Sequence, residues 1–131
     1  MYEDRSARDT VLRCAVSPSG AKIYVTNHSE HKLLTLAKDG TVISTFTDTE
    51  LQLPLGVHMT PAGQVLVCGY GSNTVIQVDR EGKKKIALLA VNKDGVDGPL
   101  SVFYNWKYGY VLVGQKNDKI LMLDLKMNNI F

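Results

Sequence analysis

The chain has 131 residues and a formal net charge of +2, and 44% of its residues are hydrophobic and 21% charged. This balance is that of one ordinary globular domain rather than a disordered tail, and so small a charge neither requires nor excludes a nucleic-acid partner. No run approaches the roughly 18 apolar residues of a membrane helix, and the polar start lacks the apolar core of a secretion signal. Composition therefore excludes collagen-like, membrane-spanning and disulfide-scaffold proteins and favours a cytoplasmic one.

Two cysteines, Cys14 and Cys68, each lie inside an apolar, strand-like run. Their spacing contains no Cys-x-x-Cys pair, so the sequence offers neither a zinc motif nor a redox motif. We expect both to be small buried side chains in a reducing compartment.

Short β-rich runs bounded by Gly, Asn, Asp, Ser or Pro occur along the whole chain. No window of 12 or more residues holds a helical apolar period, so almost no helix is expected. A fourth strand of the last unit is missing or reduced to Met127–Phe131. The predicted strands lie at about 12–16, 21–26, 32–37, 41–46, 56–60, 64–69, 74–79, 84–90, 100–104, 109–114 and 119–124.

The strand pattern repeats. Pro-x-Gly turns at Ser17–Gly20 and Thr60–Gly63 each precede a strand, and polar turns enter later strands at Leu33, Val75 and Ile120. The last three positions are 42 and 45 residues apart. Four antiparallel strands in a period of about 40–45 residues are typical of a β-propeller blade. The sequence therefore predicts an all-β fold of about three four-stranded blades, half of a six-bladed propeller.

The repeats resemble the NHL family, whose pattern includes a Pro-led opening and an Asn-His-Arg-Ile signature. Pro54–Val57 and Pro99–Val102 resemble the opening. His31–Leu33 resembles the signature with Glu30 in place of Asn, and Asn117–Ile120 departs from it at the His; Ser72–Val75 is the poorest match. The resemblance covers about 10–126. It implies a binding platform like the C-terminal domain of tripartite-motif (TRIM) ubiquitin ligases, which captures protein or RNA. No RING, B-box or coiled coil is present, so ligase activity is not expected in this chain.

The predicted domains are a polar N-terminal segment, 1–9, and blades at about 10–50, 51–95 and 96–131. Propellers close with about 4–8 blades, so three blades do not form a ring. Two explanations remain open. The chain is a piece of a longer propeller, or it pairs with itself as a homodimer that closes six blades. We favour self-association, because it buries both terminal sheet faces.

Catalytic motifs are absent from the sequence. There is no Gly-x-Ser-x-Gly elbow, and Gly69–Asn73 lacks the Gly-Lys-Ser/Thr ending of a phosphate loop. His28 and His31 share one predicted loop while His58 lies on an inner strand, and nothing makes them converge on a zinc ion. We expect no enzyme activity, cofactor or metal, and a metal-dependent NHL-like enzyme is the least favoured alternative.

We expect a partner to contact two parts of each blade: the loop between its second and third strands, and its inner strand. A rigid scaffold presents both. Protein or peptide recognition is the first expectation, and single-stranded RNA is the alternative because aromatic and basic groups are present. However, Glu30 and Asp118 lie among the basic groups, and Lys83–Lys85 is expected on the opposite side or outer rim. The candidate residues are Arg13, Asn27, His28, His31, His58, Tyr70, Asn73, Tyr104, Lys116 and Asn117.

An aromatic run, Phe103–Trp106, stands out near the end of the chain. We expect Phe103 or Trp106 to pack between blades, as large aromatic side chains do in cores. If the chain pairs, part of this run is expected at the interface, and Trp106→Ala should then weaken self-association.

Overall fold

The computed structural model describes residues 11–124, so the predicted segment 1–9 and the reduced strand Met127–Phe131 lie outside the described residues. Eleven strands form three antiparallel sheets in chain order, and one short 3-10 turn, η1 (Asn92–Asp94), lies between the second and third sheets. The strands are β1 (Val11–Val16), β2 (Lys22–Asn27), β3 (Lys32–Ala37), β4 (Val42–Phe46), β5 (Pro54–Met59), β6 (Val65–Gly69), β7 (Thr74–Val78), β8 (Lys85–Ala90), β9 (Pro99–Asn105), β10 (Tyr110–Gln115) and β11 (Ile120–Asp124).

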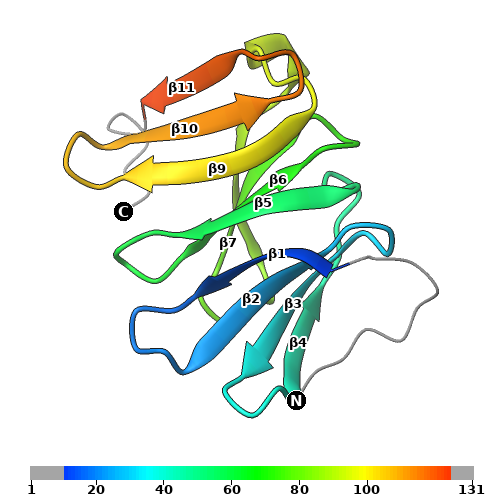
Figure 1. The fold of residues 1–131 in the computed structure, drawn as a ribbon, viewed down its shortest axis with the longest axis vertical. Helices are drawn as coiled ribbons and strands as arrows, with labels where there is room; N and C mark the ends of the chain where they lie inside the picture. Colours follow the sequence, from blue (N-terminus) through cyan, green and yellow to red (C-terminus); the bar gives the residue numbers. More distant parts are fainter. Residues whose placement is uncertain (1–10, 125–131) are drawn as a thin grey trace.

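The three sheets are the predicted propeller blades, and we call β1–β4 blade 1, β5–β8 blade 2 and β9–β11 blade 3. Figure 1 shows the blades one above another, with the inner strands β1, β5 and β9 side by side. The predicted strands agree with the observed ones to within two residues at each end. The all-β expectation is confirmed, because turn residues separate short apolar runs throughout the described chain.

Each blade turns its front face toward the preceding blade and its back face toward the following one. Side chains alternate between these faces along every strand. The core between blades 1 and 2 joins Tyr24, Leu33 and Phe46 to the front of blade 2. The core between blades 2 and 3 joins Leu66 and Val75 to the front of blade 3. Both cores are apolar, so burial of hydrophobic surface holds consecutive blades together.

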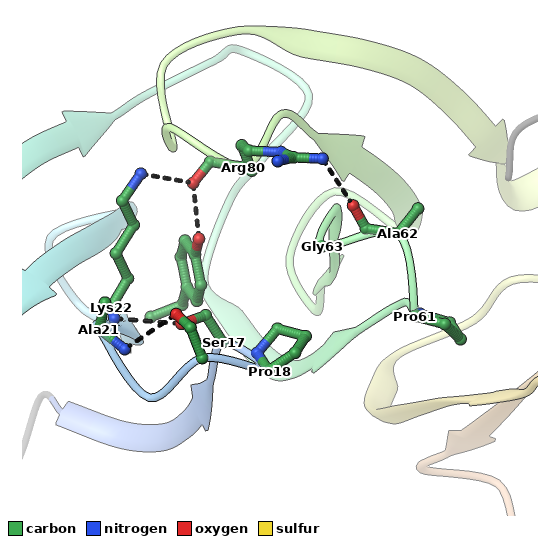
Figure 2. A pocket seen from close by; sticks show the side chains of 10 residues that line it. Ser17, Pro18, Ala21, Lys22, Pro61, Ala62, Gly63 and Arg80 are labelled. Carbon is green, nitrogen blue, oxygen red and sulfur yellow. Dashed lines mark hydrogen bonds between the residues drawn. The ribbon is translucent and has the colours of Figure 1, made fainter.

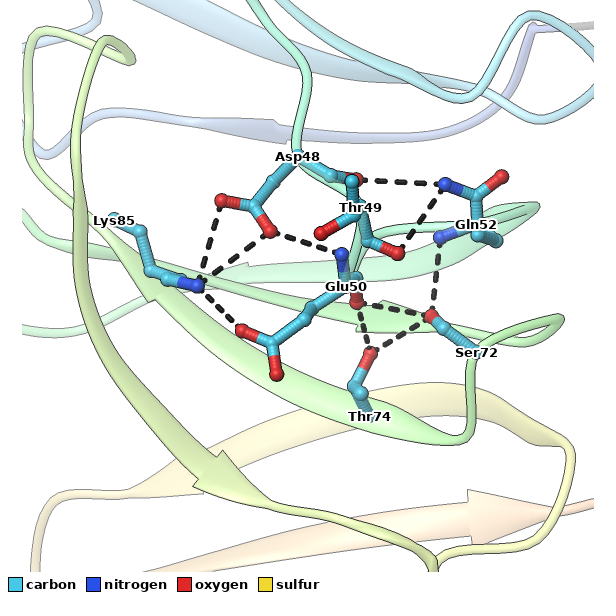
Figure 3. A network of polar contacts seen from close by, with 7 residues as sticks. All are labelled: Asp48, Thr49, Glu50, Gln52, Ser72, Thr74 and Lys85. Carbon is cyan, nitrogen blue, oxygen red and sulfur yellow. Dashed lines mark hydrogen bonds and ion pairs between the residues drawn. The ribbon is translucent and has the colours of Figure 1, made fainter.

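Polar contacts fasten the linker between β4 and β5 along blade 2 (Figure 3). The Lys85 ammonium on β8 lies 3.4 Å from Asp48 and 2.5 Å from Glu50. Thr74 Oγ1 donates to the Glu50 carbonyl at 2.6 Å, and Ser72 Oγ accepts from the Gln52 amide at 3.0 Å. The last lysine of the 83–85 run therefore lies on an outer strand, where it pairs with carboxylates of the linker.

Three side chains differ from expectation. Cys68 is buried as predicted, but Cys14 is exposed, because it pairs with Val25 on the face of blade 1 that no described blade covers. Phe103 is 51% exposed and Trp106 is 73% exposed, so neither fills a blade core. On β9 the alternation directs Val102 and Tyr104 into the core and Phe103 away from it, and Trp106 lies in the turn after β9. Residues 11–124 include no helix long and apolar enough to cross a membrane.

Candidate binding site

The predicted binding face comprises the β2–β3, β6–β7 and β10–β11 loops, and two of its residues, His31 and Asn73, bind the linkers between blades. His31 Nδ1 accepts the Leu53 amide at 3.0 Å, and Asn73 Oδ1 accepts the Gly98 amide at 2.8 Å. Both donors belong to the linker that leads into the next blade. We call this type of hydrogen bond, from a linker amide to a loop side chain, the linker clasp. It occupies Nδ1 of His31 and Oδ1 of Asn73.

Other predicted residues on this face are only partly brought together. His28 and Tyr70 lie with ring centroids 6.3 Å apart, although they come from different blades. Asn27 Oδ1 accepts the Glu30 amide and Asn117 Oδ1 accepts the Lys119 amide, so both stabilise local turns. Lys116 Nζ lies 3.6 Å from Asp97. Arg13 is exposed on β1.

The remaining two predicted residues, His58 and Tyr104, lie away from these loops and line one groove. The groove has a volume of about 360 Å³ and lies where the inner strands β1, β5 and β9 end. It is lined by Val16, Pro18, His58, Met59, Thr60, Pro61, Phe103, Tyr104 and Trp106. We call it the axial groove. Among residues 11–124 its lining is mainly aromatic, proline and aliphatic, with no lysine, arginine or carboxylate.

His58 is the one ionisable imidazole in the axial groove. Its Nδ1 accepts the Tyr104 amide at 3.0 Å, and its ring lies 4.6 Å from the Phe103 ring between centroids. Burial lowers the pKa of His58 below its ordinary value of 6.5, because the charged form loses hydration. Since Nδ1 is the acceptor, the proton of the neutral ring is on Nε2. The groove therefore combines a largely apolar wall with uncharged hydrogen-bond donors, among them His58 Nε2.

A second concavity of about 350 Å³ lies between blades 1 and 2 (Figure 2). The carbonyl of Arg80 accepts from the Tyr24 hydroxyl and, at 3.5 Å, from Lys22 Nζ. The guanidinium of Arg80 donates to the Ala62 carbonyl at 3.0 Å. Burial, and next the Glu81 charge, raise the pKa of the Tyr24 hydroxyl, so it stays protonated as a donor. These polar groups bind one another, so this concavity joins two blades.

The sequence missed most of the axial groove. Local patterns identify Pro18 and Pro61 only as turn residues, and they predict Phe103 or Trp106 in the packing between blades. The repeated Pro-x-Gly turn was the available signal, because it places a proline after two inner strands at the same end of the blades. Within residues 11–124, no three His, Cys, Asp or Glu side chains gather to hold a metal ion.

Comparisons with known proteins give the fold. No protein-family model matches the sequence, and no curated protein matches it. The structure resembles hydrazine synthase from Kuenenia stuttgartiensis with a TM-score of 0.74 and 19% identity, over 95% of this chain and 36% of that one.

A catalytically inactive virginiamycin B lyase from Staphylococcus aureus, solved with quinupristin, is similar with a TM-score of 0.64 and 15% identity, over 95% of this chain and 44% of that one. The chain thus spans less than half the length of both. At these identities the likeness is one of fold, and the fold of residues 11–124 is that of β-propeller blades.

Proposed function

We propose that this chain is a non-catalytic interaction module whose axial groove binds a peptide segment of a partner protein. The segment presents a proline or another apolar side chain to Trp106, and one of its backbone carbonyls accepts a hydrogen bond from His58 Nε2. The resemblance to NHL repeats, whose propellers capture protein or RNA, supports the same class of function.

The exposure of Trp106 carries the proposal. Its side chain is 73% exposed, and the neighbouring Phe103 is 51% exposed. Large exposed aromatic groups that border a groove mark interaction sites, because covering them releases much apolar surface from water. Tryptophan and tyrosine are also the side chains that most often dominate binding free energy in interfaces.

The chemistry of the lining favours peptide. Aromatic-lined grooves bind proline-rich segments, whose extended backbone loses little conformational entropy on docking. The neutral His58 ring adds a directional donor for a peptide carbonyl. Single-stranded RNA is the alternative, but RNA sites combine stacking platforms with basic groups. Among the residues that the structure describes, the lining of the axial groove provides the platforms but no lysine or arginine.

The experiment uses the single tryptophan of the chain as its reporter. Peptides selected from a displayed random library against the full chain are titrated into it while Trp106 fluorescence is recorded. We expect a shift of the emission to shorter wavelength on binding, because the peptide removes water from the indole. We also expect enrichment of proline beside apolar residues among the selected peptides.

Variants locate the site. Trp106→Ala should weaken binding of the selected peptides, measured by calorimetry, by at least about tenfold, as expected of a central aromatic anchor. Tyr108→Ala is the matched control, because Tyr108 is 54% exposed, follows closely in sequence and lines neither concavity. Equal affinity of the parent chain and Trp106→Ala for the selected peptides would show that the peptides do not bind in the axial groove. Tight binding of an oligouridylate that weakens steeply with salt would assign the module to RNA instead.

A further inference from the structure

We propose that the back face of blade 3 is a docking surface for blade 1 of a second copy of this chain, so that two copies close a six-bladed ring. This inference rests on Ile120 and Met122, which do not line the axial groove, and does not depend on the proposed function; Val16 and Phe103 border both surfaces.

The internal repeat shows what this face lacks. Leu33, Val75 and Ile120 hold the same place in blades 1, 2 and 3, and the first two are 0% exposed while Ile120 is 71% exposed. Two residues further along each strand, on the same face, Thr35 and Gln77 are 0% exposed and Met122 is 60% exposed. In blades 1 and 2 the following blade covers these positions. The same kind of surface, the front of a blade, therefore fits Ile120 and Met122.

The linker clasp repeats in the same way. His31, Asn73 and Asp118 are equivalent loop residues, and all three have a left-handed backbone with φ of 59°, 54° and 63°. The first two each accept a linker amide from the next blade. Among the described residues, no donor contacts the Asp118 carboxylate. Asp118 is thus an acceptor at the place where the linker of a following blade would pass.

Blade 1 carries the matching front face. Its positions Ile23, Val25, Leu34 and Leu36 correspond to Val65, Val67, Ile76 and Val78 of blade 2, which pack against blade 1 with 0% exposure. All eight side chains are aliphatic, so blade 1 of a second copy has the right surface for the back of blade 3. Two such contacts, related by a twofold axis, bring six blades together, and rings of about 4–8 blades close.

Part of the blade 1 front has little exposed surface in the single chain. Val25, Leu34 and Leu36 are each 5% exposed, whereas Val16 on the same face is 54% exposed. These three side chains have little surface left to bury, so docking gains less apolar area than a fully exposed front would provide. We therefore expect a concentration-dependent dimer rather than an obligate one.

The test is the molar mass of the full chain by light scattering over a wide concentration range. We expect it to rise from 14.5 kDa toward twice that mass. Ile120→Asp should raise the dissociation constant by at least about tenfold, because a charge would enter an apolar contact. Ile86→Asp is the matched control, since Ile86 is 46% exposed on the outer strand β8 of blade 2.

Two variants of Asp118 test the clasp. Asp118→Gly accepts the positive φ and removes the acceptor, so it should weaken the dimer. Asp118→Asn keeps an acceptor oxygen at the place where Asn73 uses one, so it should leave the dimer intact. A monomer at every concentration would overturn the proposal, and so would a dimer that Ile120→Asp leaves unchanged. Trp106 lines the axial groove rather than the Ile120 and Met122 contact, so Trp106→Ala, contrary to the expectation from the sequence, should not change the mass, and the two proposals can fail separately.

Discussion

The backbone amide of Gly98 donates to Oδ1 of Asn73 at 2.8 Å and so joins the linker before blade 3 to a loop of blade 2. One repeat earlier, Leu53 donates in the same way to His31 at 3.0 Å. Both donors precede a proline and both have positive φ, 58° at Gly98 and 49° at Leu53. The turn residue and the linker are thus a recurring pair, which explains why a polar loop residue recurs with the blade period.

This pair predicts a stability difference between two variants of Asn73. Asn73→Gly keeps the left-handed backbone but leaves the buried Gly98 amide without an acceptor, which should lower the free energy of unfolding by about 1–2 kcal/mol. Asn73→Asp retains an acceptor oxygen and should lie close to the parent. Urea unfolding measures both. Equal stability of the Gly variant and the parent would show that the clasp contributes nothing.

Gly56 on β5 lies where the backbones of the inner strands β5 and β9 approach closely. A Cβ at this position would lie 2.6 Å from Ser101 Cα and 2.9 Å from the Val102 nitrogen. Those atoms are backbone, so β5 and β9 would have to separate, and Gly56→Ala should cost about 1–3 kcal/mol or more in thermal or urea unfolding. Gly114→Ala is the control, because its closest contact is the rotatable Ser101 hydroxyl at 2.6 Å. A Gly56 variant no less stable than the control would contradict this packing.

His58 makes part of the stability depend on pH. Burial lowers its pKa in the folded chain below 6.5, so the unfolded chain binds the proton more readily. The contribution of neutral His58 to the free energy of unfolding should be fully present above about pH 6.5. It should be lost as the pH falls through 6.5 toward the lower pKa of His58 in the folded chain. His58→Asn supplies an uncharged acceptor for the Tyr104 amide and should flatten this part of the curve, measured by urea unfolding at pH 5 to 8. An unchanged curve would assign the pH dependence to other groups.

The two cysteines should react at very different rates with a thiol reagent. Cys14 is exposed, whereas Cys68 is buried and burial raises its pKa to about 12. The reactive form is the thiolate, so at pH 8 the folded chain should be labelled at Cys14 alone. Cys68 should react only after unfolding, and mass spectrometry of digested protein distinguishes the two. Rapid labelling of Cys68 in the folded chain would show that the core between blades 2 and 3 opens readily.

The candidate site was harder to predict than the fold. The sequence predicts His58 and Tyr104 as inner-strand binding residues, and both line the axial groove, but it predicts Phe103 or Trp106 in the core, whereas both line the groove as well. Strand alternation identifies which residues share a face. It does not say which turns from different blades meet, so Pro18, Pro61 and Trp106 could not be placed together from the sequence.

By itself the sequence determined the strands, their turns and their blade period, because these follow from local alternation and from residues that favour turns. It also determined that His31, Asn73 and Asp118 are equivalent. Only the tertiary structure decided that the first two bind linkers, that Cys14 and Trp106 are exposed, and that the back of blade 3 is uncovered. Those properties depend on contacts between residues that lie tens of positions apart, and no local pattern encodes which of two faces a neighbouring blade will cover.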